Sequence, residues 1–391
     1  MRDSLRILML NLEYPPLGGG AGPVTRGLAR ALVAGGHSVD VVTMRYRGLP
    51  AEADDDGVRL FRVPGIRRRL ELSHLHELAT YVWGGLRKSR ALARAAAYDL
   101  CHCHFIVPTG IIPYTLRTMP GFPPYVITSH GSDVPGYNPD RFTLVHRLTP
   151  PLLRRVLRSA AGLIVPSAAL ERLIQDRFGQ DTPPRTLIAN GIELDRFTAR
   201  PKEPRVLVAT RLFERKGVQH VIEALATLPG HGHTLEVAGD GPQHAELERQ
   251  ARDRGVPAHF HGWLSRKTLD PLFERSRIFV LATASDNFPV SLLEAMAARC
   301  AVITTRAGGC PEVVGDTGLV VEPGDVQGLR EALNRLMRDS AYAESLGERA
   351  ARRVRDQFGW AAIASRHESA YQAALQRARS SAGLDQLAAP A

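Results

Sequence analysis

Several features are absent from this sequence, and each absence excludes a class of protein. No apolar run approaches the roughly 20 residues that a membrane-spanning helix needs. Residues 5–10 form only a short strand-like run, so a signal peptide is not indicated and a cytoplasmic protein is expected. No repeat of about 20–50 residues is present. The positive charge is not accompanied by a nucleic-acid-binding motif, so we expect no nucleic-acid partner.

Cysteine is also scarce. The four cysteines are Cys101, Cys103, Cys300 and Cys310. The first two alternate with His102 and His104, which raises the question of a metal site. On a strand, alternation places the two cysteines on one face and the two histidines on the other, which suits a shared tetrahedral site poorly. We therefore expect reduced thiols and no metal at this cluster.

The 391 residues are enough for two domains of ordinary size, and 44% hydrophobic and 23% charged residues are globular values. The net charge of +10 is unevenly distributed. Residues 1–198 contain 25 Lys+Arg against 17 Asp+Glu, which leaves +2 for the rest. The arginines concentrated there are Arg67, Arg68, Arg69, Arg147, Arg154, Arg155 and Arg158. They could meet anionic lipid or an anionic acceptor, or form a solvated surface.

The stretch 284–297, ASDNFPVSLLEAMA, follows an apolar run that predicts a buried strand. Pro289 is well placed to open a helix. This leaves Asp286 at the exit of the strand and Glu294 in the first turns of the helix. The N–H groups around Val290 and Ser291 favour electron-rich ligand atoms. Carboxylates that accept and N–H groups that donate together predict a polyol site; the alternative is a plain turn in which Asp286 caps the helix.

Two further loops follow predicted strands. Residues 14–22 form a glycine loop between a strand at 6–10 and a helix at 24–34, where an α/β sheet collects phosphate. Residues 210–217 hold Arg211 and Lys216, in a chain with only four lysines. Arg211 offers a planar fork for phosphate oxygens, and Lys216 offers a mobile point charge.

The motifs together resemble the retaining glycosyltransferases of family 4, which have the GT-B fold. The signature is an acid, seven residues and then Glu-Ala-Met-Ala; its first acid is usually Glu, so Asp286 is a departure. The glycine loop, the Thr-Ser-His-Gly-Ser-Asp string around His130 and the spacing of Arg211 and Lys216 are similar to the same family. The resemblance covers nearly the whole chain.

The resemblance implies a role for each candidate residue. His130 lies beside the transferred sugar, which Asp286 faces, and these two are the candidate catalytic residues. Glu294 binds the nucleotide ribose, and Trp263 either stacks on the base or packs in a core or hinge. The candidate donor-binding residues are Gly19, Gly20, Arg211, Lys216, Gly241, Trp263, Asn287, Phe288, Pro289, Val290 and Glu294.

The expected fold class is α/β, with two doubly wound Rossmann-like domains facing a cleft. We place the acceptor-side domain at 1–198, the donor domain at 199–358, a returning helix at about 359–379 and a disordered tail at 380–391. In the first domain, residues 72–97 are expected to be largely helical, with Trp83 as an apolar contact.

The expected reaction is transfer of a sugar from a nucleotide-diphosphate donor to a hydroxyl acceptor, possible acceptors including lipid-linked ones in glycan biosynthesis. The nucleotide sugar is a co-substrate, and no cofactor is implied. No Asp-x-Asp-like string stands near these loops, so no catalytic metal is expected. A nucleotide-sugar epimerase of the same fold and a non-catalytic nucleotide-sugar-binding protein remain alternatives. The sugar, the base and the acceptor are not specified by the sequence.

Overall fold

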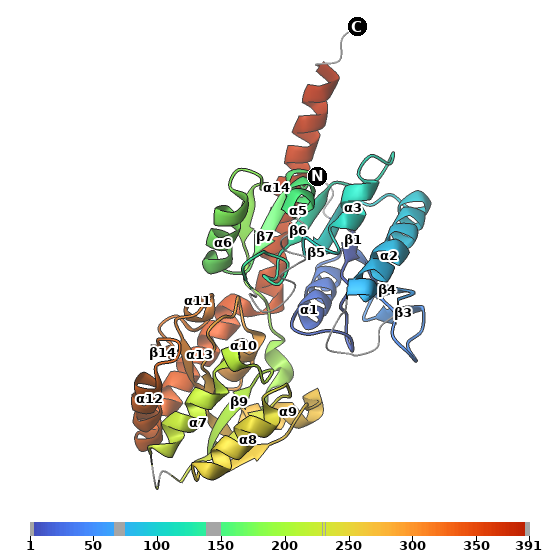
Figure 1. The fold of residues 1–391 in the computed structure, drawn as a ribbon. Helices are drawn as coiled ribbons and strands as arrows, with labels where there is room; N and C mark the ends of the chain where they lie inside the picture. The colour runs from blue at the N-terminus through green and yellow to red at the C-terminus, as the bar shows by residue number, and fades with distance from the viewer. Residues whose placement is uncertain (1–3, 66–74, 138–149, 229, 231, 388–391) are drawn as a thin grey trace. The chain divides into compact units, whose positions relative to one another are not determined.

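The computed structural model describes residues 4–65, 75–137, 150–228, 230 and 232–387, with the backbone alone at 75–76 and 381–387. The chain divides into two compact units. Unit 1 consists of Met1–Gly191 with Trp360–Ala391, and unit 2 consists of Ile192–Gly359. Each unit is built on a mainly parallel sheet covered by helices (Figure 1). Within the described residues, no helix is both long enough and apolar enough to cross a membrane.

The sheet of unit 1 has eight strands among the described residues, in the order β3-β4-β2-β1-β5-β6-β7-β8. All neighbours are parallel except β3, which pairs antiparallel with β4 at the edge. The strands are β1 (Arg6–Leu10), β2 (Ser38–Met44), β3 (Glu52–Asp55), β4 (Val58–Val63), β5 (Leu100–His104), β6 (Tyr125–Thr128), β7 (Gly162–Val165) and β8 (Arg185–Leu187).

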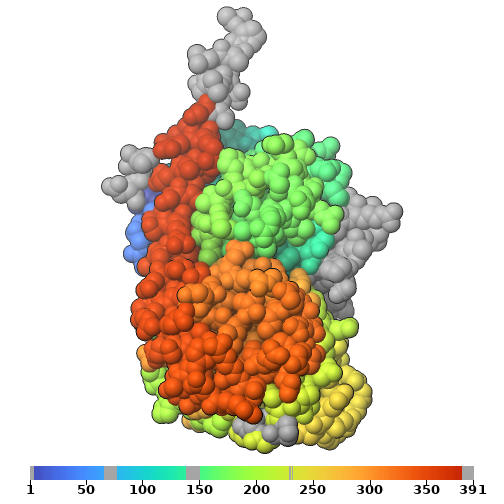
Figure 2. Space-filling model, turned by 90° about the vertical axis from the view of Figure 1, so that its left-hand side faces the viewer, coloured from blue at the N-terminus to red at the C-terminus, as the bar shows by residue number. Residues whose placement is uncertain are grey.

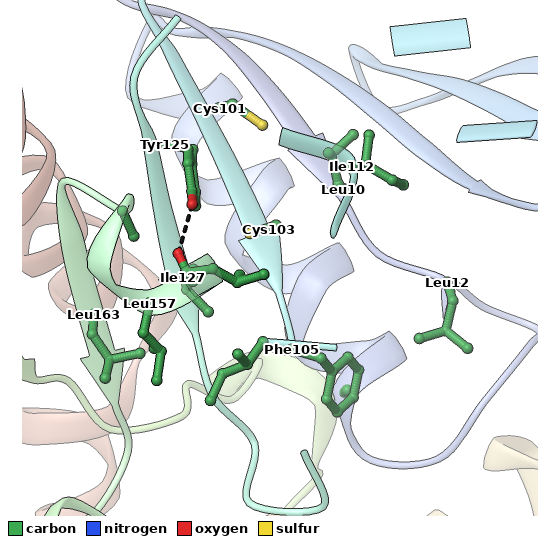
Figure 3. Packing of buried hydrophobic residues seen from close by; sticks show 14 of the residues in the cluster. Leu10, Leu12, Cys101, Cys103, Phe105, Ile112, Tyr125, Ile127, Leu157 and Leu163 are labelled. Carbon is green, nitrogen blue, oxygen red and sulfur yellow. Dashed lines mark hydrogen bonds between the residues drawn. The ribbon is translucent and has the colours of Figure 1, made fainter. Parts of the chain in front are cut away.

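Helices cover both faces of this sheet. Those in unit 1 are α1 (Ala21–Ala34), α2 (Leu75–Ala95), α3 (Ile111–Leu116), α5 (Pro150–Arg158), α6 (Ala168–Phe178) and α14 (Trp360–Leu387). Alternate residues of β1 enter different clusters: Leu8 and Leu10 pack with α2, α3, α5 and α6, whereas Ile7 and Met9 pack with α1 and α14. Figure 3 shows part of the first cluster, in which Cys101 and Cys103 lie among leucine, isoleucine and tyrosine side chains.

The sheet of unit 2 has six parallel strands among the described residues, in the order β11-β10-β9-β12-β13-β14. They are β9 (Glu203–Ala209), β10 (Thr234–Ala238), β11 (Ala258–Phe260), β12 (Ser276–Leu281), β13 (Ala301–Thr305) and β14 (Gly318–Val321). Val206 and Val208 face a cluster shared with α7, α8 and α12, whereas Phe279 contacts Phe273 of α9 on the opposite face.

The helices of unit 2 follow its strands in turn. They are the 3-10 turns η1 (Leu194–Arg196) and η2 (Glu214–Lys216), then α7 (Val218–Ala226), α8 (His244–Asp253), α9 (Arg266–Arg275), α10 (Val290–Ala297), α11 (Cys310–Val314), α12 (Val326–Arg338) and α13 (Ser340–Phe358). From β9 to α12 strands and helices alternate, which makes a parallel sheet with right-handed crossovers the expected outcome.

The boundary between the units lies seven residues before the position predicted from the sequence. The segment after Gly191 is already anchored in unit 2: Ile192 N–H donates to Phe358 O at 2.8 Å, and Thr198 N–H donates to the Glu274 carboxylate at 2.8 Å. The two prolines and mixed charges of residues 198–204 predict a linker, but Arg200 pairs with Glu274 of α9 and Lys202 Nζ donates to Phe273 O of the same helix. After Gly359 the chain returns to unit 1 as α14.

The prediction of a disordered tail from residue 380 is wrong up to Leu387. Helix α14 continues to that residue, and Ser380 Oγ donates to Gln376 O at 3.1 Å, a bond to the preceding turn of the helix. Residues 388–391 lie outside the described residues. In Figure 2 the red surface of α14 runs beside green residues of unit 1, and Arg377 Nη2 donates to Ala161 O at 3.0 Å there.

Candidate functional site

The strand order of unit 2 places a topological switch point between β9 and β12. From β9 the chain moves outward through β10 and β11, then returns to β12 and moves the other way through β13 and β14. The loops that leave the carboxyl ends of β9 and β12 therefore diverge, and the space outside such a point is where open α/β sheets bind ligands. The two loops hold residues 210–217 and 282–289, which contain five of the eleven predicted donor-binding residues.

These loops are packed backbone against backbone. Ala284 N–H, after β12, donates to Arg215 O, after β9, at 2.7 Å. Gly217 has φ of +69°, and a Cβ there would lie 2.0 Å from Ala282 O. Gly241, after β10, is equally constrained, because a Cβ would lie 2.4 Å from Leu212 O. Gly241 thus supports the loop that carries Arg211, a packing role rather than a visible ligand contact.

Lys216 and Asp286 form an ion pair across the switch point, from η2 to the loop after β12. Lys216 is 8% exposed, so its charge needs a partner inside the fold. The sequence analysis treated Lys216 as a free phosphate ligand and Asp286 as a sugar ligand, and it missed their contact across 70 positions. No local sequence signal could have revealed the pairing.

Arg211 differs from Lys216 in being exposed. Its Cζ lies 5.8 Å from the centroid of the Phe213 ring, and among the described residues no carboxylate pairs with it. An exposed guanidinium at a switch point is available to an anionic ligand. Of the two predicted phosphate ligands, Arg211 is therefore the one whose charge is uncommitted.

Helix α10 begins at Val290, with Pro289 as its N-cap. The prediction that Pro289 opens this helix is thus correct to within one residue. Asn287 and Phe288 are 5% and 6% exposed, and the Phe288 ring contacts the Phe358 ring edge-on with 5.8 Å between centroids. The Phe288 side chain is hence a packing group. In the first turn of α10, Leu292 N–H donates to Pro289 O at 3.1 Å, whereas the N–H groups of Val290 and Ser291 have no acceptor within the helix and lie at the positive end of its dipole.

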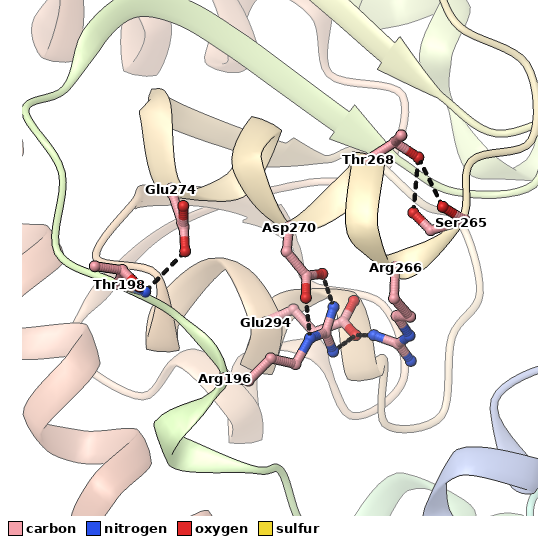
Figure 4. A network of polar contacts seen from close by, with 8 residues as sticks. All are labelled: Arg196, Thr198, Ser265, Arg266, Thr268, Asp270, Glu274 and Glu294. Carbon is pink, nitrogen blue, oxygen red and sulfur yellow. Dashed lines mark hydrogen bonds and ion pairs between the residues drawn. The ribbon is translucent and has the colours of Figure 1, made fainter.

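Glu294 lies in a network of charged side chains that the sequence analysis did not anticipate (Figure 4). It is 5% exposed, and its Oε1 accepts from Arg196 Nη1 at 2.7 Å and from Arg266 Nη1. Arg196 also forms a two-bond contact with Asp270 of α9, with Nε donating to Oδ2 at 2.7 Å. Burial opposes the charge on Arg196, but its bonds to Asp270 and Glu294 outweigh this and raise its pKa.

Trp263 lies in the loop after β11 and is 64% exposed. This excludes the core role that the sequence left open, and it leaves the indole accessible. The loop adjoins the Gly241 turn, because Gly239 N–H donates to Gly262 O at 2.8 Å.

The glycine loop of unit 1 follows β1, and its two predicted phosphate-binding residues, Gly19 and Gly20, are exposed. Added Cβ atoms at either position would meet nothing within 4 Å, so backbone approach is open. Gly19 N–H donates to Glu13 Oε2 at 3.0 Å. An anion at this N–H would therefore compete with the Glu13 carboxylate.

His130 follows β6 and is part of a group of stacked histidines. Its Nε2 lies 2.9 Å from His104 Nδ1, the rings being 5.2 Å apart between centroids. Desolvation lowers the pKa of His130 to about 4 and that of His104 well below 6.5. Asp133 holds the loop by accepting from Ser129 Oγ, Gly131 N–H and Ile106 N–H. His130 is thus a neutral, positioned imidazole.

The predicted alternation along β5 is confirmed. Cys101 and Cys103 pack in the core on one face, while His102 stacks on His104 on the other and its Nδ1 lies 2.8 Å from Tyr371 Oη of α14. Within the described part of the chain, no group of His, Cys, Asp and Glu residues is arranged to hold a metal ion.

The arginine clusters of unit 1 are only partly described. On α5, Arg154 and Arg158 both pair with Asp181, so two of the charges that were candidates for an anionic partner or a solvated surface already have a partner within the unit. Arg67, Arg68, Arg69 and Arg147 lie outside the described residues.

A separate pocket of about 480 Å³ lies at the sheet edge of unit 1, next to α2. Trp83, predicted to make an apolar contact, lines this pocket and is 60% exposed, so most of its side chain faces solvent. Arg87 Cζ lies 4.8 Å from the centroid of the Trp83 ring, and Lys88 Nζ lies 4.2 Å from the centroid of the Phe61 ring. The cations shield both rings, which explains how an apolar helix residue can face solvent.

Comparison with known proteins covers both units. The family model "Glycosyl transferases group 1" matches residues 192–353, and the model "Glycosyltransferase Family 4" matches residues 18–196. Together they span almost all of the described residues. The chain belongs to the group 1 glycosyltransferases.

Similar proteins span the length of this glycosyltransferase. The glycogen synthase of Mycobacterium tuberculosis is 29% identical over 402 residues, which cover 96% of each chain. Among solved structures, sucrose-phosphate synthase of Thermosynechococcus elongatus superposes with a TM-score of 0.79 at 24% identity, covering 94% of this chain and 98% of the other. HepE of Anabaena, in complex with UDP-glucose, superposes with a TM-score of 0.69 at 20% identity, covering 94% of this chain and 100% of the other. The GT-B fold is therefore confirmed.

The predicted residues of this glycosyltransferase fall into two groups. The carboxyl edge of the unit 2 sheet brings together Arg211, Lys216, Gly241, Asp286 and the start of α10, with Glu294 one turn into that helix. The carboxyl edge of the unit 1 sheet carries Gly19, Gly20 and His130. Arg196, Arg266 and Asp270 are the site residues that sequence reasoning missed.

Proposed function

We propose that this glycosyltransferase transfers a sugar from a nucleoside-diphosphate donor to a hydroxyl acceptor, with retention of configuration at the anomeric carbon. The observation that carries the proposal is the convergence at the switch point of unit 2. An exposed guanidinium, a lysine in an ion pair, a helix N-terminus and a buried carboxylate meet there. These are ligands for an anion joined to hydroxyl groups.

The diphosphate would be bound by Arg211, Lys216 and the first-turn N–H groups of α10. An ammonium group has three donors, so Lys216 can keep Asp286 and still donate to a phosphate oxygen. These cations face the negative charge that develops on the leaving diphosphate, which is where electrostatic stabilisation accelerates the reaction most. Since protein groups supply this charge, we propose that the enzyme does not require a metal ion.

The sugar and the nucleoside would be recognised by carboxylates and an aromatic ring. Asp286 Oδ2 is held by Lys216, and Oδ1 is left to accept from a hydroxyl of the transferred sugar. Glu294 would accept from the ribose, and the exposed Trp263 would stack on the base. The complex of HepE with UDP-glucose supports a nucleotide-sugar donor for a chain of this fold.

In the transfer step, the bond from the anomeric carbon to the diphosphate oxygen breaks and its electron pair stays on that oxygen. The acceptor oxygen forms the new bond on the same face, and its proton passes to the departing phosphate oxygen. Asp286 is engaged with Lys216, which supports a route without a covalent carboxylate intermediate. His130, kept neutral, would orient the sugar by hydrogen bonding rather than by charge.

An anionic or lipid-linked acceptor at a membrane surface would account for the excess of +8 in residues 1–198. Arg155, exposed on α5, is a described residue that could contribute, because its neighbours Arg154 and Arg158 are engaged with Asp181.

The proposal is tested with a panel of UDP-, GDP- and ADP-sugars. A donor present at 100 times its dissociation constant should stabilise the protein by about 2.7 kcal/mol in thermal unfolding. The stabilising donor should then be consumed with an acceptor, give a product of unchanged anomeric configuration by NMR, and do so in EDTA. Isomerisation of the donor without acceptor would indicate an epimerase, and binding without turnover would indicate a non-catalytic protein.

A further inference from the structure

We infer that Arg196 is a positioning residue, which holds Glu294 by Oε1 so that Oε2 accepts from the ribose of a ribonucleoside diphosphate. The inference rests on the proposed function and extends it to a residue outside the donor-binding set. Arg196 lies in η1, at the start of unit 2, 98 positions before Glu294.

The network leaves one oxygen of Glu294 open. Arg196 Nη1 and Arg266 Nη1 both donate to Oε1, whereas no described residue donates to Oε2. Without these bonds the carboxylate of Glu294 could rotate, because its terminal torsion is broad. Fixed by Oε1, it presents Oε2 in a single direction, as hydrogen bonding to a vicinal pair of ribose hydroxyls requires.

Arg196 is itself held in place. Its Nε and Nη2 donate to the two oxygens of Asp270, while Nη1 donates to Glu294, so all three nitrogens of the guanidinium are engaged. Its side chain is 14% exposed, against 49% for Arg266. The planar fork of arginine makes this three-point arrangement, whereas a lysine could not span both carboxylates. Arg196 is therefore the rigid member of the pair, and Arg266 is the adjustable one.

The two arginines also explain why Glu294 can be buried. A carboxylate that is 5% exposed has lost most of its hydration, which is expensive unless charged donors replace the water. Removal of Arg196 would therefore loosen Glu294 and weaken selection for ribose, while Arg211 and Lys216 continue to bind the diphosphate. The two consequences can be measured separately.

The test compares a ribonucleoside diphosphate with its 2′,3′-dideoxy counterpart by calorimetry, using whichever of UDP, ADP and GDP binds wild type most tightly. Wild type should prefer the ribose form by roughly tenfold to a hundredfold, since a hydrogen bond to a charged group is lost in the dideoxy form. Arg196→Gln should reduce this preference to about threefold or less, with the affinity for the dideoxy form unchanged.

Arg200→Gln is the matched control. Arg200 Nε donates to Glu274 Oε2 at 2.8 Å, so this variant breaks another arginine–carboxylate pair between the same segment and α9 without touching Glu294. It should keep the wild-type preference. If Arg196→Gln does not fold, Asp270→Asn provides the second variant: it releases the other side of Arg196 and should narrow the preference partly.

Each result decides between the inference and its alternatives. A wild-type preference retained in Arg196→Gln would overturn the inference and leave the proposed function intact. An equal loss of affinity for both ligands would show a merely structural role and overturn it as well. If wild type bound the ribonucleoside diphosphate and its dideoxy counterpart equally, Glu294 would not contact the ribose, and the inference would be overturned. Binding of none of the three diphosphates would overturn the proposed function itself.

Discussion

The two units share one architecture but arrange the edge of the sheet differently. Both sheets change direction beside their first strand, so both place their ligand-facing loops at the same topological position. In unit 2 that edge is ionic: Lys216 pairs with Asp286, and Glu294 pairs with two arginines. In unit 1 the central group is neutral: it consists of stacked histidines whose pKa values burial lowers, and the nearby Asp133 carboxylate accepts from Ser129, Gly131 and Ile106 and not from a charged donor. The same fold thus supports charge recognition in one unit and uncharged hydrogen bonding in the other.

This difference follows from what each edge can satisfy internally. Unit 2 contains carboxylates and guanidinium groups on neighbouring loops, so buried charge is always paired. Helix α14 covers the histidine face of unit 1. There the two ring nitrogens of His102 lie within hydrogen-bond distance of the hydroxyls of Thr128 and Tyr371. Neutral imidazoles are the stable form in such surroundings.

The largest effect is expected for Lys216→Ala, which removes one charge from the ionic edge. Losing a hydrogen bond to a charged group costs about 1.5–3 kcal/mol, or roughly tenfold to a hundredfold in turnover, if the contact strengthens in the transition state. Turnover should be measured at saturating donor. Lys267→Ala, at an exposed lysine of the same unit, should retain wild-type turnover. Wild-type turnover in Lys216→Ala would show that Lys216 does not contribute to sugar transfer.

Substitution of each of the two carboxylates of the ionic edge should affect binding and transfer differently. Glu294→Gln should lower the affinity for the nucleotide sugar and for the free nucleoside diphosphate by about tenfold each, because the ribose is present in both. Asp286→Asn should bind the free diphosphate at least as tightly as wild type, since Lys216 is released, yet transfer sugar poorly. Calorimetry followed by turnover measurements distinguishes them. Equal losses of diphosphate affinity would mean that the two roles are assigned incorrectly.

The neutral edge predicts acid sensitivity of unit 1. Burial lowers the pKa of His130 and of His367 to about 4, from 6.5. Between these values the unfolded chain binds more protons than the folded one, so the free energy of unfolding falls as the pH drops from 6.5 toward 4. Hydrogen exchange corrected for intrinsic rates should show greater opening of β5 and β6 at pH 5 than at pH 7. His367→Gln should reduce this difference.

That measurement also has an internal reference. Strands β9 and β12 of unit 2 should change less over the same interval, because the groups paired at their carboxyl ends are carboxylates and strong bases. Equal acid-induced opening in both units would contradict the proposed contrast.

The smallest effect is expected for membrane binding through the positive charge of residues 1–198. Flotation with anionic vesicles should recover more protein than flotation with neutral vesicles at low salt, and the difference should fade as the Debye length shortens toward about 8 Å. Arg155→Gln should lower recovery slightly. Equal recovery by both vesicle types would mean that the charge is only a solvated surface.

Much of the fold could be predicted because the buried strands are short apolar runs bounded by turn residues. The bounds of β1 agree with the strand predicted at 6–10, and the apolar run before residue 284, predicted to be a buried strand, forms β12. The edge strand β3 was missed, because its sequence EADD has low strand propensity and is held by pairing with β4. The tail was predicted to be disordered from its position at the end of the chain, although up to Leu387 it extends α14.

The site was predictable in its residues but not in its pairings. Local spacing identified Arg211, Lys216, Asp286 and Glu294, and the structure brings them to one sheet edge. The partners of Lys216 and Glu294 lie 70 and 98 positions away, so only the fold brings them together. Such ion pairs leave no periodic signal in a single sequence. This is why Arg196 was predicted to lie at the end of the first domain, at 1–198, and not in the donor site.

The central claim is that the ionic edge of unit 2 binds the nucleoside diphosphate of the donor. Hydrogen exchange with and without UDP, ADP or GDP tests it directly, because protection is read residue by residue. The claim predicts that the diphosphate that binds will protect residues 210–217 and 286–294, and that Lys216→Ala will weaken this protection. Protection confined to the glycine loop and His130 of unit 1, with unit 2 unchanged, would contradict it.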